Sequence, residues 1–236
     1  MPKLAKFFVG TVTVAALVAV AVEIAAATWQ HTAQFALLLT LTLIASRLKV
    51  KLPGVESNLS VSLPFILLAA VHLGTGEAMV IALLATSVQS LSSPMNARKF
   101  TQAQFNCATI MLATAAAQYA SSATNHLIGS TSMAVVAASI AYLAVNVGLV
   151  GSVIGLAEER SLISSVVQVF SLTFPQFVVA AGIVNFFAYT DKLSWPGVVA
   201  ALAVLVLVYI SYRRIFAELT KSTEALPRLA NAVAAH

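Results

Sequence analysis

The hydrophobic positions of this chain form long runs that polar residues interrupt only briefly. Ala, Leu and Val dominate each run, and no run alternates apolar and polar residues as a membrane β-strand of ~10 residues does. The runs therefore predict helices, which satisfy their backbone hydrogen bonds within one segment. We expect helices at residues 7–28, 33–46, 60–73, 77–92, 103–122, 132–156, 162–188 and 194–216.

Residues 46–93 depart from this plain pattern. A basic, proline-containing linker comes first, two short apolar segments follow, and a Ser-rich stretch ends the region. The two segments are hinged at Leu73-Gly74-Thr75-Gly76-Glu77, and each is shorter than the ~20 residues of a comfortable membrane span. We interpret them as a short hairpin that crosses the bundle and returns, with a single re-entrant unit as the alternative. This would be the thinnest part of the bundle and the easiest for a ligand to reach from outside.

Composition strengthens the membrane interpretation. Of the 236 residues, 60% are hydrophobic and 9% are charged, whereas soluble domains carry roughly 25% charged residues. The predicted fold class is therefore all-α: a polytopic integral membrane helix bundle at residues 1–217. The remaining residues, 218–236, form a short tail, too short for a catalytic domain. The first apolar run, 7–27, is longer than the 7–15 residues typical of a cleaved signal peptide, so we expect it to be retained.

The loop charges set the expected topology. With the N-terminus inside, the opposite side of the membrane carries only Lys192 of the 13 Lys and Arg residues. The other twelve fall in segments predicted to be cytoplasmic, as the positive-inside rule requires: Lys3, Lys6, Arg47, Lys49, Lys51, Arg98, Lys99, Arg160, Arg213, Arg214, Lys221 and Arg228. An even number of spans follows, eight preferred and six possible, with both termini cytoplasmic.

The net charge of +5 needs no nucleic-acid partner, because no basic stripe is interleaved with aromatic residues. The expected partners are the lipid bilayer of a bacterial inner membrane and a cytoplasmic or membrane protein. Walker-type, GxSxG, HExxH, HD and GxGxxG patterns are absent, and the chain has four His and a single Asp, so we expect no enzyme. The single cysteine, Cys107, lies in an apolar run and indicates neither a disulfide framework nor a Cys-based metal site. No cofactor is expected.

Ionisable groups in apolar helices are candidates for function because burying them is costly. Glu23 lies about one turn before the predicted outer end of the first helix. It either reaches the interface to contact water or faces inward as a functional carboxylate.

His72 and Glu77 flank the hinge and are predicted on the same outer side as Glu23, His31 and His126. Together such side chains would bind a divalent cation or sense pH through histidine protonation. No HxxxH or ExxH spacing marks a metal site, however. The simpler interpretation places Glu77 in the first turn of its helix, where the dipole favours an acid, and His72 in water.

Amide side chains in the apolar helices need hydrogen-bond partners. Most would bond across helices and hold the bundle together. The alternative is a polar pocket lined by the three amides that lie well within their helices: Asn106, Asn146 and Gln176.

The central stretch resembles the integral-membrane N-terminal regions of bacterial HD-GYP and GGDEF cyclic-di-nucleotide signalling proteins. The similar features span most of residues 31–217: RLKVKLPG at 47–54, SVSLPF at 60–65, Leu73-Gly74 with Glu77, Phe105-Asn106 and the helix exit Tyr212-Arg213-Arg214. The resemblance implies a sensor region whose last helix feeds a cytoplasmic output domain. Because this sequence ends about 20 residues after the last apolar run, we expect a stand-alone sensor or a truncated relative.

The layout is also similar to the substrate-binding membrane subunit of energy-coupling-factor vitamin transporters. The segment LGTGEAMVIALLATSVQSL, residues 73–91, is similar to their Gly-hinged third and fourth helices. The leading hypothesis is a sensor module that relays a ligand or membrane signal to a partner through Tyr212 to Lys221. The alternative hypotheses are a small-solute uptake subunit that needs a partner ATPase and a structural membrane subunit without a ligand.

Overall fold

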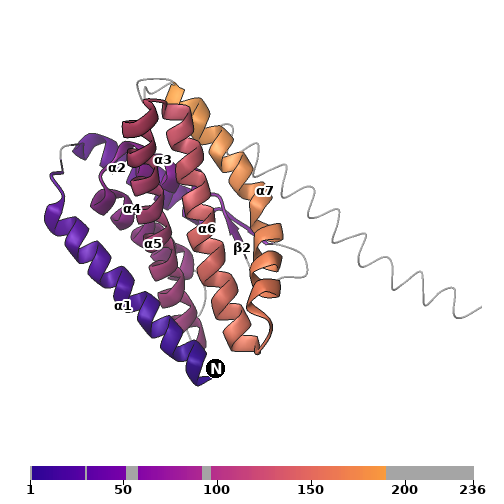
Figure 1. Cartoon of the computed structure of the whole chain (residues 1–236). Coiled ribbons are helices and arrows are strands. Elements are labelled where there is room, and N and C mark those ends of the chain that lie inside the picture. Colours follow the sequence, from indigo (N-terminus) through magenta and orange to yellow (C-terminus); the bar gives the residue numbers. More distant parts are fainter. Residues whose placement is uncertain (1, 30, 52–57, 92–96, 190–236) are drawn as a thin grey trace, which may run out of the picture. The chain divides into compact units, whose positions relative to one another are not determined.

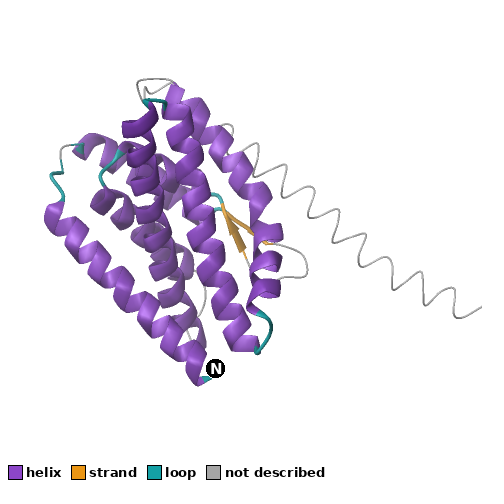
Figure 2. Ribbon diagram, in the orientation of Figure 1, coloured by secondary structure: helices purple, strands orange, loops and turns teal. Residues whose placement is uncertain are grey.

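The computed structural model describes residues 2–29, 31–51, 58–91 and 97–189. Within these ranges the chain forms seven helices and one two-stranded hairpin (Figures 1 and 2). In chain order they are α1 (Lys3–Ala26), α2 (Thr32–Arg47), β1 (Lys49–Lys51), β2 (Asn58–Ser60), α3 (Leu63–His72), α4 (Thr75–Leu91), α5 (Ala97–Ile128), α6 (Thr131–Glu158) and α7 (Leu162–Tyr189). The predicted eighth helix at 194–216 and the tail at 218–236 lie outside the described residues.

The first seven predicted helices are all present, most with ends shifted by a few residues. The largest difference is at α5, predicted over 103–122 and observed over Ala97–Ile128. Polar residues at both ends of this helix continue its hydrogen bonding beyond the apolar run, and an apolar run alone cannot reveal such turns.

The hairpin of β1 and β2 was not predicted. The two strands pair antiparallel with Lys49 opposite Ser60, Val50 opposite Leu59 and Lys51 opposite Asn58. The helices belong to one compact unit, and the hairpin belongs to a second. The expected all-α fold class is confirmed, because the described chain is helical apart from this pair of three-residue strands.

Three helices in the described part of the chain are long and apolar enough to cross a membrane: α1, α6 and residues Leu162–Phe187 of α7. Their most apolar windows have mean hydropathies of 2.3, 2.1 and 1.7, yet only 22, 33 and 17% of these windows is buried. Exposed apolar surface on this scale marks an interaction surface rather than a water-facing one. The chain therefore has the character of a membrane protein.

Helix α3 lies at the centre of the helical unit. It contacts α2, α4, α5, α6 and α7, and its residues from Leu63 to Ala70 are all buried. A helix that is apolar on every side is buried in this way. With 10 residues it is about 15 Å long, about half of the ~30 Å hydrocarbon core of a bilayer.

Helix α1 packs through one narrow stripe. Val9, Val12, Ala16 and Val20 contact a core formed with Met79 of α4 and with α5. Leu4, Phe7, Val14, Leu17, Val18 and Val22 on other faces of the helix are exposed. The stripe holds α1 against the other helices up to its C-terminal turns, where Glu23 lies.

Helices α6 and α7 approach each other through small residues. A Cβ added at Gly151 would lie 2.6 Å from the Cα atom of Val166, and one at Gly155 would lie 2.8 Å from Leu162 Cδ2. At Gly148 an added Cβ would meet nothing within 4 Å. Two of the three glycines of the Gly148-Gly151-Gly155 series therefore set the close approach expected of small residues in membrane helices.

Candidate functional site

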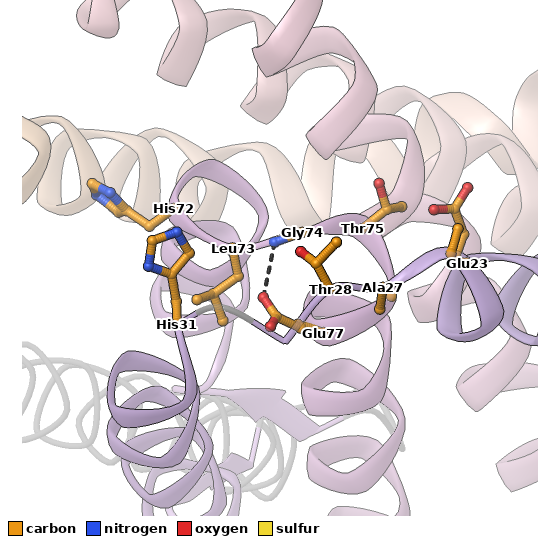
Figure 3. Close-up of a pocket in the computed structure, with 11 residues that line it drawn as sticks. Glu23, Ala27, Thr28, His31, His72, Leu73, Gly74, Thr75 and Glu77 are labelled. Atoms are coloured by element: carbon orange, nitrogen blue, oxygen red, sulfur yellow. Dashed lines mark hydrogen bonds between the residues drawn. The ribbon is translucent and has the colours of Figure 1, made fainter.

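A cavity of about 300 Å³ lies where the end of α1, the loop that follows it, the end of α3 and the start of α4 meet. Eleven of the described residues line it: Glu23, Ala26, Ala27, Thr28, His31, His72, Leu73, Gly74, Thr75, Gly76 and Glu77. The whole LGTGE hinge is therefore part of its wall. In the view of Figure 3, His31 and His72 lie together, Glu23 lies at the opposite end, and Glu77 lies between them.

Glu77 lies in the first turn of α4 and caps the N-terminus of that helix. It is 3% exposed, and its Oε2 atom accepts a 3.0 Å hydrogen bond from the Gly74 backbone N–H. Gly74 in turn accepts the first helical hydrogen bond of α4, from Ala78. A Glu at the third helical position that reaches back to the N-cap residue is half of a capping box. The predicted position of Glu77 in the first helical turn is confirmed.

Gly76 lets α4 touch the backbone of α1. A Cβ at this position would lie 2.7 Å from the Glu23 carbonyl oxygen and 2.9 Å from the carbonyl carbon. These are backbone atoms, which cannot swing aside as a side chain can. Only glycine therefore allows the first turn of α4 to sit against the last turns of α1 and close the cavity on this side.

Thr75 ties the start of α4 to α5. Its Oγ1 atom donates to Gln118 Oε1 at 2.8 Å, and Gln118 Nε2 donates to Ser122 Oγ at 3.0 Å. Thr75 is buried, so its hydroxyl needs this partner. Gln118 thus forms the kind of interhelical hydrogen bond that we expected of amide side chains in apolar helices.

Glu23 faces the cavity and also contacts α5. Tyr119 Oη donates a hydrogen bond to Glu23 Oε1, and the Glu23 side chain is half-buried. The Glu23 side chain therefore lies on the cavity wall and is partly open to solvent, and a functional role for it stays a prediction.

The histidines border the open side of the cavity, where both are exposed. In the loop before His31, Trp29 adopts a positive φ of 50°, which is unusual for a bulky residue. Its ring packs edge-on against Phe35, with centroids 5.4 Å apart.

The structure brings together four of the five side chains that we expected at the outer rim: Glu23, His31, His72 and Glu77. The fifth, His126, is exposed and does not line the cavity. Within the described ranges no three His, Cys, Asp or Glu residues are arranged to hold a metal ion. A directly coordinated divalent cation therefore finds no support in this geometry, and ligand binding itself remains a prediction.

The three amides predicted to line a polar pocket do not line this cavity. Asn106 is exposed, and Asn146 and Gln176 are half-buried. Asn106 faces outward because the buried face of α5 runs through Phe105, Ala108 and Met111. Sequence position along a helix gives depth in the bundle, but not the direction in which the side chain points.

Three residues important for the site were missed or undervalued in the sequence. Gly76 was read only as part of a hinge, Thr75 was not singled out, and Tyr119 was not considered. A usable signal existed for Tyr119, because it lies near the outer end of the predicted helix 103–122, the same end as Glu23. The close approach at Gly76 left no such signal.

No protein-family model matches the sequence, and a search of the curated proteins finds no match. The proposed role of the chain therefore depends on its own residues and geometry.

Proposed function

We propose that the chain is a sensor module of a bacterial inner membrane, which binds a small ligand at the outer end of its helix bundle and relays this event to a cytoplasmic partner. The observation that supports it is the cavity itself. Its walls come from the ends of α1, α3 and α4. A ligand that contacts several elements can favour one arrangement of them over another, which is what a sensor requires.

The central position of α3 offers a physical route for the relay. Its last residue, His72, lines the cavity, and the same helix contacts α7 along the bundle. A shift of α3 would therefore reach α7, which leads toward the predicted last helix at 194–216. The partner would read the movement through residues 212–221.

The proposed topology has both termini in the cytoplasm and an even number of spans. The basic residues argue for it through the positive-inside rule. The short, buried α3 argues for treating α3 and α4 as one re-entrant pair in a six-span arrangement, beside the eight-span arrangement that the apolar runs favour. In both arrangements the cavity faces outward and Lys49 lies inside.

A second function is favoured by one observation. The N-terminus of α4 and the C-terminus of α3 meet at the cavity, and interrupted helices of this kind form the substrate sites of many transporters. The alternative is therefore the substrate-binding subunit of a small-solute uptake transporter, for a vitamin-like molecule and with a partner ATPase.

The test compares the full chain with a chain that lacks residues 217–236, both purified natively from membranes. For a sensor, the full chain co-purifies with a cytoplasmic signalling protein and the shortened chain does not, while ligand binding is retained by both. Co-purification with a transporter ATPase would favour the uptake subunit instead. If neither partner is recovered and no ligand raises the thermal stability, both proposals fail and a structural subunit remains.

Labelling of intact cells tests the topology. A single cysteine placed at Lys49, in a chain with Cys107→Ser, should react with a membrane-impermeant reagent only after the membrane is opened. Labelling from the outside would overturn the proposed orientation.

A further inference from the structure

We propose that the cavity binds a small organic cation that carries a primary ammonium group. This inference rests on the proposed ligand-binding function and specifies its ligand class. It starts from the charges of the wall: the eleven lining residues include two Glu and two His, but no Lys or Arg. The formal charge that the wall presents at neutral pH is therefore negative.

Glu77 provides the strongest single argument. Its side chain is 3% exposed, and its Oε2 atom is used by the Gly74 N–H. Its other oxygen, Oε1, accepts no hydrogen bond from the described part of the chain. This oxygen borders the cavity and is not sealed inside the protein, so it is open to a ligand, and an ammonium group would supply both a donor and the opposite charge.

Glu23 offers a second acceptor at the other end of the cavity (Figure 3). Its Oε1 atom is held by Tyr119, which orients the carboxylate and leaves Oε2 as an acceptor. The imidazole rings of His31 and His72 also line the wall. The wall is thus rich in acceptors, whereas the hydroxyl of Thr75 is already engaged with Gln118.

Other ligand classes fit less well. A helix N-terminus normally attracts anions, but the carboxylate of Glu77 already occupies the N-terminus of α4. A bare metal ion would need a set of three or more ligating side chains, which the described residues do not form. A cavity of about 300 Å³ is at the small end of ligand sites, so a compact amine fits better than a large cofactor.

The experiment uses three four-carbon probes whose two end groups are cationic, neutral or anionic: putrescine, its uncharged diol analogue and succinate. Zinc chloride serves as a fourth probe for metal binding. The chain has two tryptophans, so Trp195→Phe leaves Trp29, beside the cavity loop, as the only fluorescent indole. Purified full-length protein with this substitution should show saturable fluorescence changes with putrescine and none with the other three probes.

Two substitutions then locate the binding. Glu77→Gln keeps an oxygen for the Gly74 N–H, since Gln also serves in capping boxes, but it removes the charge. Glu23→Gln likewise keeps an acceptor for Tyr119. Each should weaken putrescine binding by about tenfold to a hundredfold, as the loss of a charged hydrogen bond does. Glu158→Gln, at an exposed ion pair with Arg160, is the matched control and should leave binding unchanged.

Several outcomes would overturn the ammonium assignment. Saturable binding of the diol, succinate or zinc that depends on Glu23 or Glu77 would keep the ligand-binding function and reject the ligand class. Putrescine binding that neither substitution weakens would place the amine elsewhere. No response to putrescine also rejects the assignment, and the sensor proposal is then judged by its partner experiment alone. If Glu77→Gln does not fold, the effect of Glu23→Gln on putrescine binding still tests whether the amine binds in this cavity.

Discussion

The α6–α7 pair and the α3–α4 hairpin use the same packing device for different ends. In both, glycine allows a contact with backbone that no side chain permits: Gly151 against Val166 and Gly76 against Glu23, where an added Cβ would lie 2.6 and 2.7 Å away. Around Gly151 the partners are long apolar helices with exposed outer faces. Around Gly76 the partners are helix ends that carry polar side chains and line a cavity.

The difference predicts that the stability of the bundle and the proposed ligand binding depend on different contacts. Helices α6 and α7 are closest near the turn that connects them, and they also share one of the largest helix interfaces in the described chain, so separating them disturbs many contacts. The end of α1 and the start of α4 are close at their termini, where local displacement is easier. We therefore expect damage to α6–α7 to reduce global stability and damage at Gly76 to reduce binding first.

The largest effect on stability is expected for Gly151→Ala. The added methyl group overlaps the Val166 backbone and should lower the free energy of unfolding by about 1–3 kcal/mol. Thermal unfolding in detergent, followed by circular dichroism, measures it. Gly148→Ala on the same helix is the control: its Cβ meets nothing within 4 Å, and alanine should stabilise the helix by up to about 1 kcal/mol. Equal effects of the two substitutions would contradict close packing at Gly151.

An intermediate effect on stability, with the greatest effect on binding, is expected for Gly76→Ala. Its methyl group would push the last turns of α1 away from α4 and open the cavity wall. We expect a loss of about 1–2 kcal/mol in unfolding free energy together with loss of the putrescine-dependent change in Trp29 fluorescence. Gly10→Ala, on the exposed side of α1 with nothing within 4 Å, should preserve both. Intact binding in Gly76→Ala would show that the α1–α4 contact does not shape the site.

The smallest effect is expected for Thr75→Val, which keeps the side-chain shape and removes the hydroxyl donated to Gln118. The unfolding free energy should fall by about 0.5–1.5 kcal/mol, the usual worth of one hydrogen bond. Thr40→Val is the matched control, because the exposed Thr40 hydroxyl bonds only within its own helix, to the Ala36 carbonyl. If Thr75→Val and Thr40→Val lower the unfolding free energy equally, the Thr75–Gln118 hydrogen bond between α4 and α5 contributes little to the stability of the site.

The hydropathy pattern was enough to predict the first seven helices, because the backbone N–H and C=O groups of an apolar run satisfy their hydrogen bonds within a helix. It also indicated which residues share one end of the bundle. Alternating helix directions placed Glu23, His31, His72 and Glu77 on the same side, and the structure places all four on one cavity. The same reasoning placed His126 there, but α5 continues to Ile128, so His126 lies on a helical turn rather than in a loop near the cavity.

Only the tertiary structure decided which way side chains point and which backbones touch. Asn106 was a good candidate by depth, yet it faces outward, because rotation about a helix axis is set by packing against neighbours. The hydrogen bond from Tyr119 to Glu23 and the contact at Gly76 join residues far apart in sequence. Local sequence determines a helix through short-range hydrogen bonds, whereas a cavity between helix ends depends on distances that only the packed bundle defines.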